Sequence, residues 1–137
     1  MNTLALFVAL FALLMPTAGI VTLGHRSVYR TEQDPTGRYT AVVSYRSYLS
    51  LLPGGFGDGS GKPGFVEIFD ESRASLGEVP LPMLFQASPG AIQWKPAGAW
   101  INVIAEWDFS KGTCCYHDDD DDAHFASRCP VGWKSCL

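Results

Sequence analysis

The apolar positions of the chain form one long block at the start and short alternating runs further on. Residues 4–23 contain no charged side chain, and as a helix these twenty residues would span about 30 Å, the thickness of a bilayer's hydrocarbon core. Their weakly polar members do not gather on one helical face, as they would in a helix packed on a soluble core. The block predicts a transmembrane helix, within an anchor over 1–24, that contacts membrane lipid through residues 4–23.

A cleaved signal peptide is the competing interpretation of this block. Its apolar region would cover 4–14, followed by Pro16 and small residues. Two features disfavour it, because residues 1–3 contain no Lys or Arg and no clean small-x-small cleavage site stands before Ile20. We therefore expect an uncleaved signal anchor and a single-pass membrane protein.

After a linker over 25–38, apolar and polar side chains alternate with the period of a β-strand. In 39–49, Tyr39, Ala41 and Val43 share one face, which we expect to point to the core. Both faces of 65–70 are expected to be partly buried. Strands are predicted at 39–49, 65–70, 76–79, 92–94 and 100–107, with a short edge strand at 83–86.

The segment 100–107 has the most regular alternation and predicts one continuous strand, with Ile101, Val103 and Ala105 on the same face. Pro- and Gly-rich turns separate these strands, and no helical period follows residue 24. The fold class is therefore mainly β. We expect a small antiparallel meander of about five or six strands over 39–109, built as a sandwich or an open barrel. The Cys/Asp-rich tail, 110–137, is expected to be irregular.

Length and charge narrow the function classes. The 137 residues suit one modest domain, and the net charge is -4. Five consecutive aspartates at 118–122 supply more than this excess, and without them the remainder carries +1. A nearly neutral body offers no field that would steer it onto phosphates, so we expect no nucleic-acid partner.

All four cysteines fall between residues 114 and 136. An even number in a short tail is typical of disulfides in an exported protein. Cys114 and Cys115 are adjacent and would bond to each other only with strain, so each is expected to pair with Cys129 or Cys136.

The same tail is also a candidate zinc site, the only cofactor that the pattern suggests. The spacings Cys114-x-x-His117 and His124-x-x-x-x-Cys129 are acceptable for a tetrahedral ion, although paired C-x-x-C knuckles are absent. The candidate ligands are the six cysteine and histidine side chains of the tail: Cys114, Cys115, His117, His124, Cys129 and Cys136.

Two signals disagree on the orientation in the membrane. Arg26, Arg30 and Arg38 follow the apolar block while no basic residue precedes it, which by the positive-inside rule places the domain in the cytoplasm. The cysteines favour an oxidising compartment. We expect an exported domain, periplasmic or extracellular.

No catalytic constellation accompanies these features, so we expect a protein that is not an enzyme. The segment Gly59–Gly64 matches G-x-G-x-x-G but lacks the following helix that a dinucleotide site needs. No G-x-S-x-G motif is present. The candidate contact residues are aromatic and would otherwise serve as core anchors: Phe56, Trp94, Trp100 and Trp107.

The stretch 45–70, with YRSYLSLLPG, the glycine loop and PGFVEIFD, followed by Ile92-x-Trp94, resembles small bacterial single-pass membrane proteins. The resemblance implies an N-terminal hydrophobic segment and a short β-rich domain, brings no activity with it and does not extend to the tail. We expect a non-enzymatic membrane-anchored β-domain that acts by protein–protein contact in the cell envelope or as an accessory subunit of a membrane complex. A metal-binding or redox module centred on the tail, and a small immunity or inhibitor protein, are the alternatives.

Overall fold

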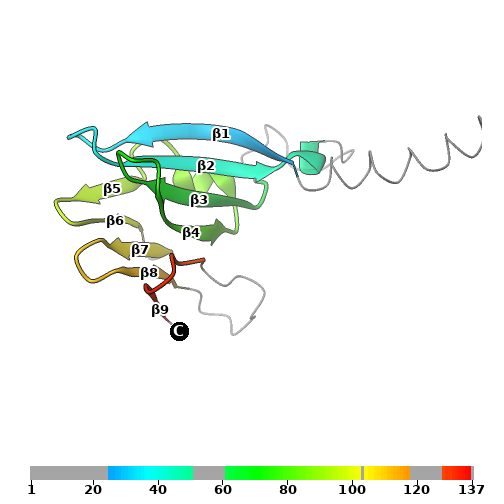
Figure 1. Cartoon of the computed structure of the whole chain (residues 1–137). Helices are drawn as coiled ribbons and strands as arrows, with labels where there is room; N and C mark the ends of the chain where they lie inside the picture. Colours follow the sequence, from blue (N-terminus) through cyan, green and yellow to red (C-terminus); the bar gives the residue numbers. More distant parts are fainter. Residues whose placement is uncertain (1–24, 51–60, 103, 118–127, 137) are drawn as a thin grey trace, which may run out of the picture.

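Nine β-strands form two sheets in the computed structural model, which describes residues 25–50, 61–102, 104–117 and 128–136 (Figure 1). For the last two of these residues only the backbone is described. Among the described residues no helix has the length and hydropathy needed to cross a membrane. The predicted transmembrane segment, 4–23, lies outside them.

The first sheet is an antiparallel meander whose strands follow chain order. Alternation is the reason it forms, because Ala41, Val43, Val66 and Ile68 all point inward and are fully buried. This confirms the expected core face of the segment after residue 39. The strands are β1 (Arg26–Gln33), β2 (Thr40–Arg46), β3 (Gly64–Phe69) and β4 (Ser75–Leu81).

Strand β1 lies within the stretch expected to be a linker. Its inward positions, opposite Val43 and Ala41 of β2, are Arg30 and Glu32, which form an ion pair with an N–O distance of 2.9 Å. A β-bulge after Val28 also shifts the register. Inward charges on an edge strand discourage pairing with another chain, and they remove the apolar alternation by which a strand is recognised.

The turn between β1 and β2 lies at Asp34-Pro35-Thr36-Gly37, where Pro and Gly favour a turn. The carboxylate of Asp34 accepts hydrogen bonds from the Tyr39 amide at 2.9 Å and from the amide and hydroxyl of Thr36. Burial raises the pKa of Asp34, but these hydrogen bonds outweigh it and hold the pKa below the ordinary value.

The second sheet takes its last two strands from the tail that was expected to be irregular. Four strands are antiparallel, and the fifth pairs in parallel with β8. The strands are β5 (Ile92–Lys95), β6 (Gly98–Ile101), β7 (Ala105–Asp108), β8 (Thr113–Tyr116) and β9 (Lys134–Cys136).

The prediction of one strand over 100–107 is wrong, because the chain reverses there. Asn102 has a φ of 24°, and the amide of Ile104 donates to the carbonyl of Ile101 at 2.9 Å. Strands β6 and β7 therefore form a hairpin in which Ile101 lies opposite Ala105. Alternation continues through the turn, which hides the reversal in the sequence.

The predicted edge strand at 83–86 is wrong as well. A 3-10 helix, η2 (Leu84–Ala87), occupies this segment, and the Gln86 side chain accepts a hydrogen bond from the Met83 amide at 3.0 Å. Leu84 and Ala87 are fully buried, so η2 closes the core beneath β2, β3 and β4. A second short 3-10 helix, η1 (Ser47–Ser50), ends the strand predicted over 39–49.

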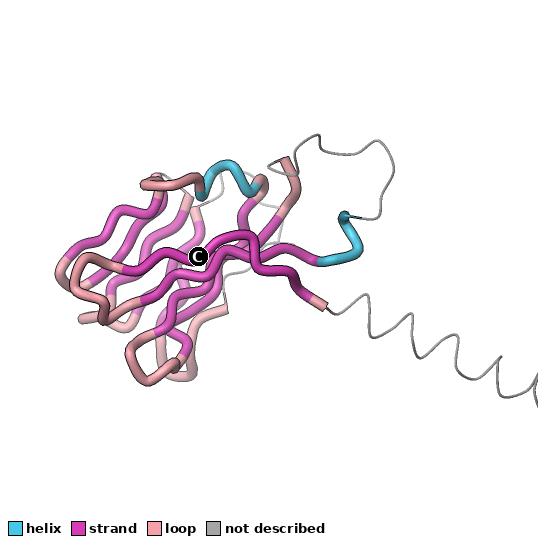
Figure 2. Tube along the Cα trace, turned by 90° about the horizontal axis from the view of Figure 1, so that it is seen from above, coloured by secondary structure: helices cyan, strands magenta, loops and turns pink. Residues whose placement is uncertain are grey.

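The two sheets share one core and meet where β4 contacts β7 and β8 (Figure 1). Figure 2 shows the strands and the two short helices from above. The expectation of a small antiparallel β-fold is confirmed at this level. The largest fully buried side chains come from both sheets and from η2: Trp107, Ile68, Leu81, Leu84 and Ile101.

Candidate functional site

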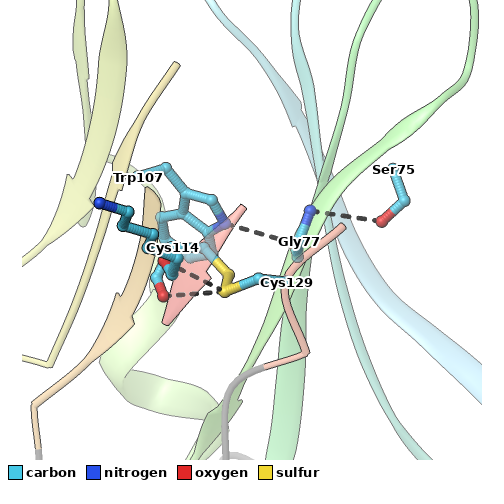
Figure 3. Close-up of a disulfide and its surroundings, with 6 residues drawn as sticks. Ser75, Gly77, Trp107, Cys114 and Cys129 are labelled. Carbon is cyan, nitrogen blue, oxygen red and sulfur yellow. Dashed lines mark hydrogen bonds between the residues drawn. A yellow bond between two sulfur atoms is a disulfide. The ribbon is translucent and has the colours of Figure 1, made fainter. Parts of the chain in front are cut away.

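A disulfide joins β8 to a later part of the tail. Cys114 and Cys129 are bonded, with their Cα atoms 5.7 Å apart and a sequence separation of 15 (Figure 3). Cys115 is also disulfide-bonded, and the backbone register sets it opposite Cys136 of β9. The predicted pairing of Cys114 with one of the two later cysteines is therefore confirmed.

The disulfide lies against the junction of the sheets. Gly77 of β4 has a φ of 118°, and a Cβ atom at this position would lie 2.8 Å from the Cys114 sulfur. The carbonyl of Gly77 accepts a hydrogen bond from the Trp107 indole at 3.2 Å (Figure 3). Only glycine satisfies both the backbone conformation and the close approach.

Arg128, where the last described segment of the chain begins, continues the first sheet. Arg128 and Glu78 exchange two backbone hydrogen bonds, of 2.7 and 2.8 Å, in an antiparallel bridge. The bridge covers part of the outer edge of β4, and Cys129 follows it directly. The disulfide thus holds this short pairing in place, and the edge of β4 is protected.

The predicted zinc ligands are not assembled among the residues with described positions. No group of three or more His, Cys, Asp or Glu side chains is placed to hold a metal there. Cys114 and Cys129 are bonded to each other, and zinc binds thiolates rather than disulfide sulfurs. His117 is exposed and His124 lies outside the described residues.

A pocket of about 290 Å³ opens on the outer face of the first sheet. Its centre is an ion pair in which both terminal nitrogens of Arg26 donate to the carboxylate of Glu78. The Arg26 guanidinium also lies 4.2 Å from the centroid of the Phe65 ring. The hydrogen bond to Glu78 outweighs burial and raises the pKa of Arg26 above its usual value.

We call this cavity the basic pocket because three arginines line it against one acid. Glu78 is the only acidic residue in the described lining, and Arg26 already occupies it. Arg46 and Arg128 are exposed, and neither forms a side-chain ion pair within the described part of the chain. Two guanidinium groups therefore face the cavity with their donors available.

A second cavity, of about 500 Å³, lies on the outer face of the second sheet and carries no charged side chain in its described lining. We call it the neutral groove. Phe85 of η2 is 52% exposed beside it, and Trp100 of β6 forms part of its wall. Its other principal lining residues are Gln86, Gln93, Asn102 and Ile104.

Of the four predicted contact aromatics, Trp100 lines the neutral groove, and none is in the described lining of the basic pocket. Trp107 is 1% exposed at the junction, and Trp94 is half-buried against the core. Phe56 lies outside the described residues. Phe85 is not identified by the sequence pattern, because the pattern predicts an edge strand over 83–86 and not η2.

The basic pocket is not visible in the sequence pattern either. Arg26 and Glu78 are 52 residues apart, and no local spacing joins them. The only available signal was the alternation in 65–70, which places Phe65 on the outer face.

The described strands and the Cys114–Cys129 bond define a disulfide-linked β-domain of two sheets that share one core. A comparison with protein-family models, with curated proteins and with solved structures finds no match to this chain.

Proposed function

We propose that the chain is a non-enzymatic binding domain, anchored in a membrane through residues 4–23, that contacts a second envelope protein through the neutral groove. The observation that carries the proposal is the exposure of Phe85 beside Trp100 in a cavity whose described lining contains no charged side chain. Large exposed aromatic side chains at a cavity are typical of protein contact sites.

The bonded pair of cysteines supports an exported domain. The Cys114–Cys129 disulfide persists in an oxidising compartment and would be reduced in most cytosols. A partner must therefore be reachable from the exported side of the membrane, and we propose another membrane or envelope protein.

The chemistry of the groove favours an extended, uncharged partner segment. Phe85 and Trp100 offer apolar surface for one side chain, while the amides of Gln86, Gln93 and Asn102 can hydrogen-bond to its backbone. The described lining contains no charged side chain that could pair with a charged one, and the nearby Lys95, whose ammonium lies 5.6 Å from the Trp100 ring centroid, is already paired with Glu106.

Site-specific photo-crosslinking in membranes tests this proposal. A photoreactive residue at Phe85 or at Trp100 of the full-length chain is expected to crosslink the same partner, through an uncharged segment of it. Tyr29 is the matched control, since it is 42% exposed but lies on β1 of the other sheet. Crosslinks to an acidic segment, or an identical pattern from Tyr29, would contradict the proposed groove.

A quantitative readout accompanies the crosslinks. Trp100→Ala is expected to weaken copurification of that partner at least about tenfold, the loss typical of a buried aromatic anchor. Tyr29→Ala should leave it unchanged. Retention of the full-length chain in the membrane pellet after alkaline carbonate washing tests the anchor separately.

A further inference from the structure

We propose that the basic pocket binds the phosphate of an anionic phospholipid headgroup in the membrane that holds the chain. The inference rests on the proposed anchoring by residues 4–23. It assigns a ligand to a site other than the neutral groove, and it concerns how the domain sits on its membrane rather than which protein it contacts.

Chain length places the pocket near the membrane surface. Three residue steps separate the end of the predicted span, Leu23, from Arg26, where β1 begins. Each step covers at most about 3.6 Å, so the Cα atom of Arg26 lies within about 11 Å of the end of the span. This distance is short enough for an arginine side chain to reach the headgroup layer.

The other basic residues of the pocket lie at the same end of the first sheet. Arg26 is opposite Arg46 in the β1–β2 register, and the amide of Ser47 donates to the carbonyl of His25 at 3.0 Å. Lys62 adds a fourth positive charge there, with its ammonium 3.3 Å from the Ser50 hydroxyl. Figure 1 shows β1 beginning and β2 ending beside η1, at one end of the sheet.

Two further arginines lie in turns at the opposite end of the first sheet. Arg38 and Arg73 lie in the β1–β2 and β3–β4 turns and are exposed. Neither lines the basic pocket. These two arginines have the same charge as the pocket pair but cannot reach the same ligand, so they form a matched control.

Phosphate suits the groups that the pocket leaves available. Glu78 neutralises Arg26 and holds it in place, whereas Arg46 and Arg128 retain planar guanidinium donors that match phosphate oxygens. Tyr48 and Leu49 add an apolar wall beside them. Tyrosine beside basic residues is typical of the membrane–water interface, where the ring contacts acyl chains and the hydroxyl stays in water.

Position decides between a lipid and an acidic peptide as the source of the negative charge. Lipid headgroups are present at high local concentration beside the anchor, and each nearby basic residue adds to the attraction for an anionic headgroup. An acidic partner would need to enter between the domain and the bilayer. The acidic run 118–122 of the chain itself is the other competitor, and the experiment must separate it.

Native mass spectrometry of the full-length protein in neutral detergent micelles tests the inference. The protein is titrated with phosphatidylglycerol, with phosphatidylcholine and with inorganic phosphate. We expect the dissociation constant for phosphatidylglycerol to be at least about tenfold lower than that for phosphatidylcholine. The double variant Arg46→Gln/Arg128→Gln should weaken phosphatidylglycerol binding about 30-fold, from two basic contacts. The control Arg38→Gln/Arg73→Gln should stay within about twofold of the wild type.

Four outcomes would overturn the inference. These are equal binding of the two lipids, equal losses in the pocket and control variants, competition by inorganic phosphate at the lipid's own concentration, and displacement of the lipid by an aspartate-rich peptide. Replacing Asp118–Asp122 with asparagine should change lipid binding less than about twofold, while a tenfold gain would identify that run as the native occupant. The titration does not depend on insertion in a bilayer, so carbonate washing and lipid binding can fail independently.

Discussion

Two neighbouring residues of β4 serve opposite faces of the first sheet. Gly77 faces the junction, where it meets the Trp107 indole and the Cys114 sulfur, and Glu78 faces outward into the basic pocket. The junction is buried and covalently linked. The pocket is open and holds charges that its own residues do not all satisfy. Stability should therefore depend on the Gly77 side and ligand binding on the Glu78 side.

The largest expected effect comes from adding one methyl group at the junction. Gly77→Ala combines a positive φ, about 1 to 2 kcal/mol, with an overlap on the disulfide that cannot relax freely, for a total loss of about 4 kcal/mol in the free energy of unfolding. Gly90→Ala is the control, because Gly90 has a φ of 81° but a Cβ atom added there would have no atom beyond its chain neighbours within 4 Å. Urea unfolding of the full chain in micelles measures both variants. Gly90→Ala should lower the free energy of unfolding by about 1 kcal/mol. Equal losses for Gly77→Ala and Gly90→Ala would contradict the close approach of Gly77 to the disulfide.

Removing the crosslink is expected to have the next largest effect. Cys114→Ala/Cys129→Ala releases a closure of fifteen residues, which stabilises the protein by about 3 kcal/mol. The bridge between Arg128 and Glu78 should open with it, so trypsin should cleave after Arg128 faster than in the wild type. An unchanged urea midpoint and cleavage rate would show that the tail is held by other contacts.

The indole at the junction provides a smaller and more specific test. Trp107→Phe leaves the Gly77 carbonyl buried without its donor and should cost about 2 kcal/mol. Trp94→Phe is the matched control, since the Trp94 Nε1 is buried with no hydrogen-bond partner among the described residues. Its removal should cost less than about 0.5 kcal/mol in the same unfolding assay, because no hydrogen bond is lost. Equal costs would mean that the Trp107 hydrogen bond contributes nothing specific.

Asp34, in the turn before β2, should make the free energy of unfolding depend on pH, independently of the junction and the basic pocket. Because the folded state lowers the pKa of Asp34, its contribution is complete above the ordinary pKa of 3.8 and is lost as pH falls through the lower folded value. Asp34→Asn should cost about 1 kcal/mol at pH 7 and progressively less below pH 3.8. Unfolding curves of both proteins across the acid range measure this. A gap that widens in acid would contradict the sign.

The smallest expected change in stability comes from the basic pocket and separates its role from that of the junction. Arg46→Gln/Arg128→Gln should alter the free energy of unfolding by less than about 0.5 kcal/mol, since both side chains are exposed and make no ion pair among the described residues. Thermal unfolding in neutral detergent provides the measurement. A loss comparable to that of Trp107→Phe would show that the pocket supports the fold rather than a ligand.

Local alternation was enough to predict the strands whose faces differ in polarity. Ala41 and Val43 alternate with less buried neighbours, and β2 was predicted from them. Strand β1 could not be found in this way, because Arg30 and Glu32 occupy its inward positions. The hairpin at Asn102 was hidden for the opposite reason, since the apolar alternation runs through it.

The sites depended on contacts that no local pattern contains. The cysteines were identified from their number, and Cys114 pairs with one of the two expected partners. Only the fold joins Arg26 to Glu78 across 52 residues, and only the 3-10 geometry of η2 exposes Phe85 beside Trp100. Which side chains from distant parts of the chain meet depends on the strand topology, and the sequence pattern did not determine that topology.

The intact mass of the full-length protein tests the central claim, a disulfide-linked domain in an oxidising compartment, most directly. Alkylating agent is added to the cells before lysis, and the protein is then denatured without reductant. We predict an uncleaved chain in which none of the four cysteines is alkylated, and four adducts after reduction. Four adducts without reductant would contradict the account and return the tail to a thiol or metal site.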